Sequence, residues 1–262
     1  MAILLSDYES GRALDGDYAE QLAAVQRRLA RIQVAYIVHG RRAIVMVEGW
    51  DASGKGGVIR RLTAGLDVRH VAVWPIGAPT PTERARHFLW RFWTKLPADG
   101  DINIFDRGWY GRVLADRVDR RATEKEWRRA YDEINEFEAQ QKDSGTTIVK
   151  LFLHVTQEEQ DRRFRARLAD PWKRWKIGAD AVRARDQRAD YVAAVEAMFD
   201  KTDTRWAPWK AIDAGDKRQA RIAAMTHVAD MLEKAVPMKP PALDADITRL
   251  ASERFGMVLA DG

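Results

Sequence analysis

The sequence predicts an α/β fold in which a parallel β-sheet carries helices on both faces. Short apolar runs alternate with longer amphipathic segments along most of the 262 residues, as expected for strands that are connected by helices. A glycine-rich turn follows the first apolar run, an arrangement that presents a backbone loop at the edge of a sheet. The hydrophobic content of 46% is sufficient for a core, which excludes a disordered chain.

Apolar residues recur at intervals of three and four between positions 20 and 40, which predicts an amphipathic helix after a polar arm over 1–18. The other elements follow from the same periodicities and from glycine and proline breaks. Strands are expected over 43–47, 70–74, 101–105, 146–155 and 209–213. Helices are expected over 58–66, 82–95 (capped by Thr82), a segment ending near 118, 124–142, 157–168, 190–201 and 216–234.

One domain is expected over 1–262, because no internal repeat or clear linker divides the chain. The basic and aromatic segment 158–190 is expected to be an insertion that folds over the mouth of the site as a lid. The proline-rich stretch at 237–241 opens a C-terminal tail that extends to residue 262.

Bulk composition narrows the class of protein. Cysteine is absent, which removes disulfides, thiolate metal sites and cysteine nucleophiles and agrees with a reducing cytoplasm. A signal peptide and a membrane span are not expected, because the early residues are acidic and no apolar run is long enough. The net charge is +5, and residues 162–188 hold ten lysines and arginines but only three aspartates. Such a basic surface suits a polyanion; a solvated helix face is the alternative interpretation.

The apolar run at 43–47 leads directly into Gly-Trp-Asp-Ala-Ser-Gly-Lys-Gly-Gly at residues 49–57. A strand, a glycine-rich turn with a lysine and a following helix form the layout of a phosphate-binding P-loop, the Walker A motif. Lys55 and the helix N-terminus both add positive charge to this loop. The small residues that let backbone N–H groups converge on phosphate oxygens are Gly49, Ala52, Ser53, Gly54, Gly56 and Gly57. The alternative is a purely structural glycine turn.

Two carboxylates are candidates to hold magnesium. The usual P-loop has Ser or Thr after the lysine, where the hydroxyl group binds the metal, but this chain has Gly56, so Asp51 is the candidate to take over that role. Asp106 directly follows the largely apolar run 102–105, which is the form of a Walker B element. Ligands bind at the carboxyl ends of parallel strands, so we expect both carboxylates at one edge of the sheet. Alternatively, Asp106 only caps the helix that follows.

Arg107 and Arg112 accompany Asp106 in the sequence. Phosphoryl transfer depends mainly on positioning and on neutralising negative charge, so arginines beside a magnesium site are expected parts of such a centre. The five histidines are scattered without metal-ligand spacing, and no histidine chemistry is predicted.

With these motifs assembled, the chain resembles the polyphosphate kinase 2 family. Residues 48–57 are close to that family's Walker A form, which also has glycine after the lysine, and residues 106–110 resemble its Walker B form. The family commonly has serine where this chain has Gly108, a change that removes a hydroxyl group but no charge. Residues 164–176 resemble the family's lid, and residues 202–209 resemble the entry to its C-terminal strand.

The resemblance extends from about residue 20 to 236 and implies a three-layer, thymidylate-kinase-like P-loop fold. It also implies transfer of a phosphoryl group between inorganic polyphosphate and a nucleotide, dependent on magnesium or alternatively manganese. On that template Asp51 and Asp106 position the metal ion and the accepting phosphate. Lys55 and Arg107 hold the transferred group, and Arg167 reaches in from the lid.

The same template supplies further basic residues to line a channel for the polyphosphate chain, against the alternative of plain surface charge. These residues are Arg60, Arg61, Arg112 and Lys173. A polyphosphate chain is a dense polyanion, so its binding is expected to weaken as salt rises.

The acceptor is left open between a nucleoside monophosphate and a diphosphate. Trp50 and residues 75–80 resemble the family members that use monophosphates, which implies conversion of AMP to ADP. The single-domain length is compatible with the members that convert ADP to ATP. Two other functions are alternatives: an ATP-dependent nucleotide or small-molecule kinase, and a polyanion- or nucleic-acid-binding ATPase whose segment 171–176 stacks bases. We expect neither nucleic acid nor a membrane as partner. Aromatic residues around 88–93, together with the resemblance, imply a homodimer or a homotetramer.

Overall fold

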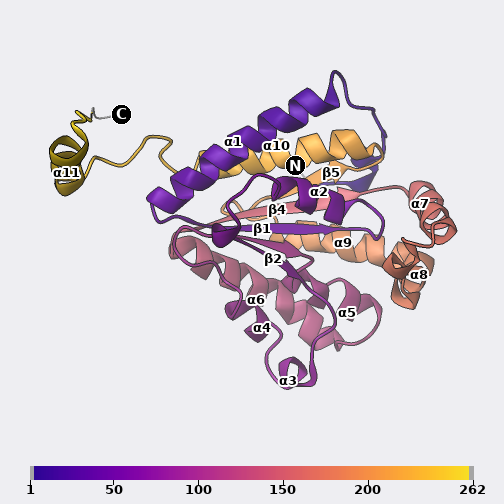
Figure 1. Ribbon diagram of the computed structural model, residues 1–262. Coiled ribbons are helices and arrows are strands. Elements are labelled where there is room, and N and C mark those ends of the chain that lie inside the picture. Colours follow the sequence, from indigo (N-terminus) through magenta and orange to yellow (C-terminus); the bar gives the residue numbers. More distant parts are fainter. Residues whose placement is uncertain (1–2, 260–262) are drawn as a thin grey trace.

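A sheet of five parallel strands forms the centre of the computed structural model, which describes residues 3–259 (Figure 1). The strands are β1 (Arg42–Gly49), β2 (Val71–Pro75), β3 (Ile102–Asp106), β4 (Thr146–His154) and β5 (Trp209–Asp213). Their order across the sheet is β2-β3-β1-β4-β5, and every pairing is parallel. The predicted sheet and its five strands are therefore confirmed.

Helices cover both faces of this sheet, which gives the three predicted layers (Figure 1). On one face α1 (Tyr18–Val38) and α2 (Lys55–Leu62) both contact α10 (Lys217–Glu233). On the other face α6 (Glu124–Asp143) packs against β4 and against α9 (Arg188–Thr202). The short helices α4 (Trp90–Trp93) and α5 (Ala115–Val118) lie beside α6.

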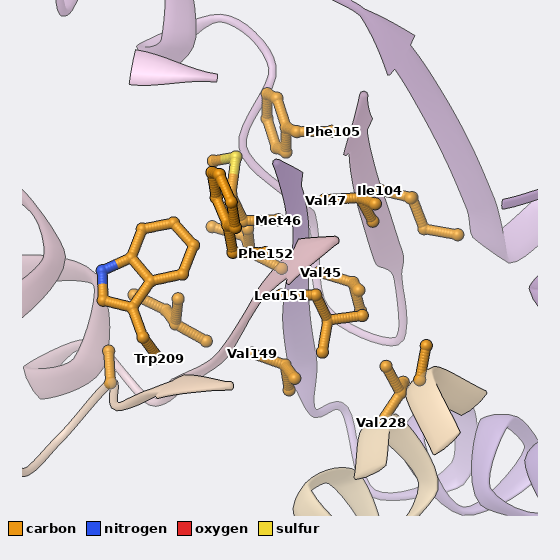
Figure 2. Close-up of a cluster of buried hydrophobic side chains, with 14 of the residues drawn as sticks. Val45, Met46, Val47, Ile104, Phe105, Val149, Leu151, Phe152, Trp209 and Val228 are labelled. Atoms are coloured by element: carbon orange, nitrogen blue, oxygen red, sulfur yellow. The ribbon is translucent and has the colours of Figure 1, made fainter. Parts of the chain in front are cut away.

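The core is centred on β1 and β4, whose residues are almost all buried. This is the expected state of inner strands in a sheet that is covered on both faces. Side chains alternate between the two faces, so Met46 and Phe152 point towards Trp209, whereas Val45 points towards Val228 of α10 (Figure 2).

The helix expected over 82–95 is wrong in its extent. The structure has two short helices there, α3 (Pro81–Arg84) and α4. Thr80 rather than Thr82 caps α3, because Glu83 lies at the third helical position and completes a capping box with Thr80. Pro81 takes the first helical position, where the missing N–H costs nothing.

Three other boundaries differ from the predicted ones. Helix α2 begins at Lys55 and not at 58, because Gly54 closes the loop with a left-handed φ of 114°. The segment ending near 118 is a 3-10 turn, η3 (Trp109–Arg112), followed by α5. The stretch 170–188, where no helix or strand is predicted, contains η4 (Arg174–Lys176) and α8 (Ala179–Asp186).

The N-terminal arm packs against the sheet, whereas the C-terminal tail does not. In the N-terminal arm, η1 (Leu5–Tyr8) buries Leu5, and both Ser10 Oγ and the Gly11 N–H donate to Asp213 Oδ2 at 2.8 Å. The tail contains α11 (Ala245–Phe255), which lies apart from the sheet and its helices (Figure 1). Residues 1–2 of the predicted arm and 260–262 of the predicted tail lie outside the described residues.

The remaining elements are η2 (Val68–His70), which leads into β2, and α7 (Gln157–Ala169), which follows β4. Across residues 3–259, we find no helix that combines the length and the apolar character needed to span a membrane.

Candidate phosphate-binding site

The register of the sheet brings the two predicted motifs together. Val47 of β1 pairs with Asp106 at the end of β3, and Gly49 pairs with Leu153 of β4. The P-loop and the Walker B carboxylate therefore leave the same carboxyl edge, on neighbouring strands.

Two glycines shape the loop because no other residue fits. A Cβ atom on Gly49 would lie 2.4 Å from the Leu153 carbonyl oxygen, and its φ of 139° is one that residues with side chains rarely adopt. Gly54 has a φ of 114° directly before the first residue of α2. Both motifs also hold one non-glycine residue with positive φ, Ala52 at 63° and Arg107 at 64°. Such backbone angles are uncommon and concentrate at functional sites.

Lys55 lies inside the loop, where its Nζ donates to the carbonyl oxygens of Gly49 at 2.7 Å and Trp50 at 2.9 Å. Burial lowers the pKa of Lys55, while the nearby carboxylates partly offset this effect. The lysine thus reaches the predicted place, and in this structure its charge is held by the loop's own carbonyl groups.

Asp51 and Arg107 form an ion pair across the two motifs. The backbone N–H of Arg107 donates to the Val47 carbonyl oxygen at 3.0 Å, which fixes the start of the turn after β3. The predicted metal-binding and phosphate-binding side chains therefore neutralise one another in this structure.

Glu48 is a member of the site that the sequence analysis did not single out. Its carboxylate is buried and accepts a hydrogen bond from the Gly108 N–H at 2.8 Å, so it joins the end of β1 to the turn after β3. Burial raises the pKa of Glu48 to about 7, despite the opposing effects of Lys55 and Arg107. The sequence signal that could have identified Glu48 is its position as an acidic residue directly after the apolar run 43–47.

Gly108, where the family commonly has serine, is packed against Met46. A Cβ atom on Gly108 would lie 2.3 Å from both Cε and Sδ of Met46, so a serine requires that flexible side chain to move. The Met46 side chain therefore occupies the space that a serine side chain at position 108 would need.

The segment predicted to be a lid contacts the loop through α7. The Gln160 side chain donates to the Asp51 carbonyl oxygen at 2.9 Å. Arg167 is half-buried on the same helix; burial lowers its pKa and the charge of Asp51 partly restores it, which places the two groups within electrostatic range. The reach of Arg167 into the site stays a prediction.

A cavity of about 660 Å³ opens beside these groups. It extends from the P-loop towards residues 76–92 and 107–126 and is rimmed by arginines on several elements. These arginines are Arg84, Arg86, Arg91, Arg107, Arg112 and Arg121. Seven carboxylates also line the cavity, and Arg91, Arg107, Arg112 and Arg121 already pair with some of them. A concave site with these arginines suits a phosphorylated ligand that replaces such pairs.

Some predicted basic residues lie elsewhere. Arg60 is exposed on α2, and Arg61 Nη1 donates to the Gly57 carbonyl oxygen on the same helix. Lys173 is exposed between α7 and η4 and pairs with Asp170. None of these three lines the cavity, so their place along a polyphosphate channel stays a prediction.

The donor set fits magnesium. Asp51 and Asp106 supply hard oxygen ligands at one sheet edge, and magnesium typically takes one or two protein carboxylates together with substrate phosphates and water. Ser53 Oγ is buried in the loop without a hydrogen-bond partner among the described residues, so it offers one further oxygen. Over residues 3–259, no group of three or more His, Cys, Asp or Glu side chains is arranged to hold a metal ion.

Comparisons with known proteins identify the family to which the chain belongs. The family model for polyphosphate kinase 2 matches residues 13–240. A polyphosphate:AMP phosphotransferase from Pseudomonas syringae is 46% identical over 84% of this chain and 44% of its own length. An ADP-polyphosphate phosphotransferase 3 from Rhizobium meliloti is 38% identical over 81% of this chain and 75% of its own. The chain spans about half the length of the polyphosphate:AMP phosphotransferases that it matches.

Solved structures of polyphosphate kinase 2 are similar to this chain in fold. The crystal structure of polyphosphate kinase 2 from Arthrobacter aurescens superposes with a TM-score of 0.86 at 34% identity, over 94% of this chain and 90% of the other. That of a putative polyphosphate kinase 2 from Pseudomonas aeruginosa superposes with 0.85 at 44% identity, over 88% and 50%. This protein therefore belongs to the polyphosphate kinase 2 family.

Proposed function

We propose that this protein transfers a phosphoryl group from inorganic polyphosphate to a nucleotide, with Mg²⁺ as cofactor. The observation that carries the proposal is the meeting of Lys55, Asp51 and the Asp106–Arg107 turn at one sheet edge, beside an arginine-rimmed cavity. Family membership favours polyphosphate as the donor.

The positively charged side chains would hold the transferred phosphoryl group. Lys55 and Arg107 release their present partners and hold the oxygens of the transferred group, whose negative charge they neutralise. Arg167 adds a third positive charge from the lid. The attacking phosphate is already an anion, so no strong general base is required.

Asp51 and Asp106 would hold magnesium between them. When bound there, the metal would neutralise negative charge on the phosphate groups. Glu48 contributes by fixing the turn that follows Asp106, through the Gly108 N–H.

A nucleoside monophosphate is the acceptor that we favour. The relatives at 44–46% identity are named polyphosphate:AMP phosphotransferases, whereas those named for ADP are at 38% or less. The cavity provides room for a nucleotide beside the loop. ADP is the alternative acceptor.

The test is to incubate the purified protein with Mg²⁺, long-chain polyphosphate and either AMP or ADP, and to follow the nucleotides by chromatography. ADP formed from AMP supports the favoured acceptor, and ATP formed from ADP alone supports the diphosphate. If neither nucleotide changes while ATP phosphorylates another acceptor, polyphosphate transfer is contradicted and an ATP-dependent kinase is supported. Omitting polyphosphate is the control.

Assembly into a homodimer or homotetramer and a cytoplasmic location stay predictions. Trp90 and Trp93 are both partly exposed, which is compatible with an interface around α4. Light scattering on the purified protein would determine the number of subunits.

A further inference from the structure

The lid helix α7 holds three consecutive carbonyl groups of the P-loop. Gln160 donates to the carbonyl oxygen of Asp51 at 2.9 Å, and Arg163 Nη1 donates to those of Ala52 at 3.0 Å and Ser53 at 2.9 Å. These peptide groups are the ones whose orientation determines where the loop's N–H groups point.

Arg163 also joins this loop to a second one. Its Nη2 donates to the carbonyl oxygens of Ala214 at 2.6 Å and Gly215 at 2.9 Å, between β5 and α10. Its side chain is 3% exposed, and Glu159 provides the countercharge at 2.5 Å. A planar guanidinium with five N–H donors can bridge four carbonyl groups in this way, whereas a lysine cannot.

An apolar contact reinforces the polar one. Ala52 packs against Phe164 of α7 and Ala181 of α8, with Ile177 beside them, in a cluster separate from the main core. Ala52 is the loop residue with a left-handed φ of 63°, so the lid contacts the loop at its least favourable backbone conformation.

The hydrogen bonds from Arg163 link the orientation of the P-loop peptide groups to the position of α7. In a trans peptide the C=O and the N–H point in opposite directions, so holding the Ser53 oxygen turns the Gly54 N–H away from Arg163. A movement of α7 that carries Arg163 with it would rotate these peptide groups.

We propose that Arg163 is a positioning residue that couples the lid to the P-loop, so that phosphate binding in the loop and the position of residues 170–188 depend on each other. Its turnover test rests on the proposed function, whereas its coupling test does not. The coupling is a linkage between two parts of one site and must act in both directions.

The variants are Arg163→Lys and a matched control, Arg162→Met. Arg162 is the preceding residue of α7 and pairs with the same Glu159 at 2.6 Å, but its side chain is 66% exposed and bonds to neither loop. We expect Arg163→Lys to lower kcat for polyphosphate-driven transfer by about 100-fold, the loss that a misplacement of about 1 Å causes. We expect Arg162→Met to stay within about twofold of the wild type, as a surface substitution should.

The coupling test uses tripolyphosphate with Mg²⁺ as the probe and trypsin as the reporter. Lys173, Arg174 and Lys176 are exposed in the lid, and cleavage there can be followed by mass spectrometry. In the wild type and in Arg162→Met, saturating tripolyphosphate should change the cleavage rate. In Arg163→Lys, tripolyphosphate should still bind by calorimetry but leave that rate unchanged, a result that a merely structural role would not produce.

Three results would overturn the proposal: a ligand effect in Arg163→Lys equal to that of the wild type, no ligand effect in the wild type, or a normal kcat in folded Arg163→Lys. If Arg163→Lys does not fold, Gln160→Met removes the bond to Asp51 while keeping side-chain length, and it must weaken the same ligand effect. If the wild type binds tripolyphosphate with the expected effect but does not turn over, the proposed function fails and the coupling stands.

Discussion

The charged side chains of the P-loop and of the turn after β3 are either buried or paired with an opposite charge. Lys55 is enclosed by loop carbonyl groups, Asp51 pairs with Arg107, and Glu48 is buried beside both motifs. Buried charges of this kind are costly to fold and concentrate at functional sites.

Lys55→Ala should abolish phosphoryl transfer without unfolding the protein. The loop is shaped by Gly49, Gly54 and backbone hydrogen bonds, and removing a buried ammonium group also removes its desolvation cost. Turnover and thermal melting should be measured together, with the exposed Lys125→Ala as control. Near-normal turnover in Lys55→Ala would show that the site assignment is wrong.

Glu48→Gln should remove a pH dependence of stability. Burial raises the pKa of Glu48 from 4.5 to about 7 in the folded state, so the folded protein binds more protons than the unfolded chain between these values. Stability from this group is therefore present below pH 4.5 and is lost as pH rises towards 7. The loss is at most about 3 kcal/mol, since one pKa unit corresponds to about 1.4 kcal/mol.

The measurement is urea unfolding of both proteins at pH 5 and pH 8. Glutamine can still accept from the Gly108 N–H, so Glu48→Gln should gain stability over the wild type at pH 8 but much less at pH 5. An equal difference at both pH values would contradict the assignment of this titration to Glu48.

At the scale of elements, a buried ion pair joins β4 to α6 beneath the Walker B turn. Lys150 Nζ donates to Glu138 at 2.9 Å and to the Tyr110 hydroxyl at 2.8 Å. Trp109 Nε1 donates to the same carboxylate at 3.0 Å. The strand and the helix thereby anchor the two aromatic residues that follow Arg107 and Gly108.

Lys150→Met should destabilise the fold by about 3–5 kcal/mol, because it leaves the Glu138 carboxylate buried without its countercharge. Replacing Glu138 by Met as well should recover part of this loss, since apolar residues of similar volume tolerate the site better than a single charge. Urea unfolding of the two single variants and the double variant gives the coupling energy. Additive losses would contradict the pairing.

At the scale of the whole molecule, distant segments meet at the carboxyl edge of the sheet. Glu9 of the arm bonds His154 Nε2 at 2.9 Å, and the Trp50 indole N–H donates to the other ring nitrogen at 2.7 Å. Arg188 of α9 lies 3.8 Å above the Trp50 ring. The P-loop is therefore supported by the arm, by β4 and by α9, while the tail lies elsewhere (Figure 1).

Removing residues 241–262 should leave both the unfolding midpoint and the turnover unchanged. Helix α11 lies apart from the sheet and exposes Ile247 and Phe255, and the family match ends at residue 240. The bond from His39 to the Lys239 carbonyl oxygen would be retained. Urea unfolding and the nucleotide assay test this prediction, and a lower midpoint in the shortened chain would show that the tail stabilises the fold.

The sequence by itself determined the sheet, the layers and the two motifs. These depend on local signals: apolar strand periodicity, glycines at positive φ, and an aspartate at a strand end. Thr82 was a wrong cap because Thr80 and Glu83 formed the better local pair. The resemblance rested on the same local motifs, and the family model confirmed it.

Only the tertiary structure decided which charges face the site. Arg162 and Arg163 are adjacent in one basic run, yet Arg162 is exposed to solvent whereas Arg163 is buried and bonds to two loops. The difference arises because packing sets which face of α7 points towards the loops. Glu48 and Lys150 acquire their roles from neighbours brought by other strands and helices. Burial and long-range pairing are properties of the packed molecule, and no local pattern encodes them.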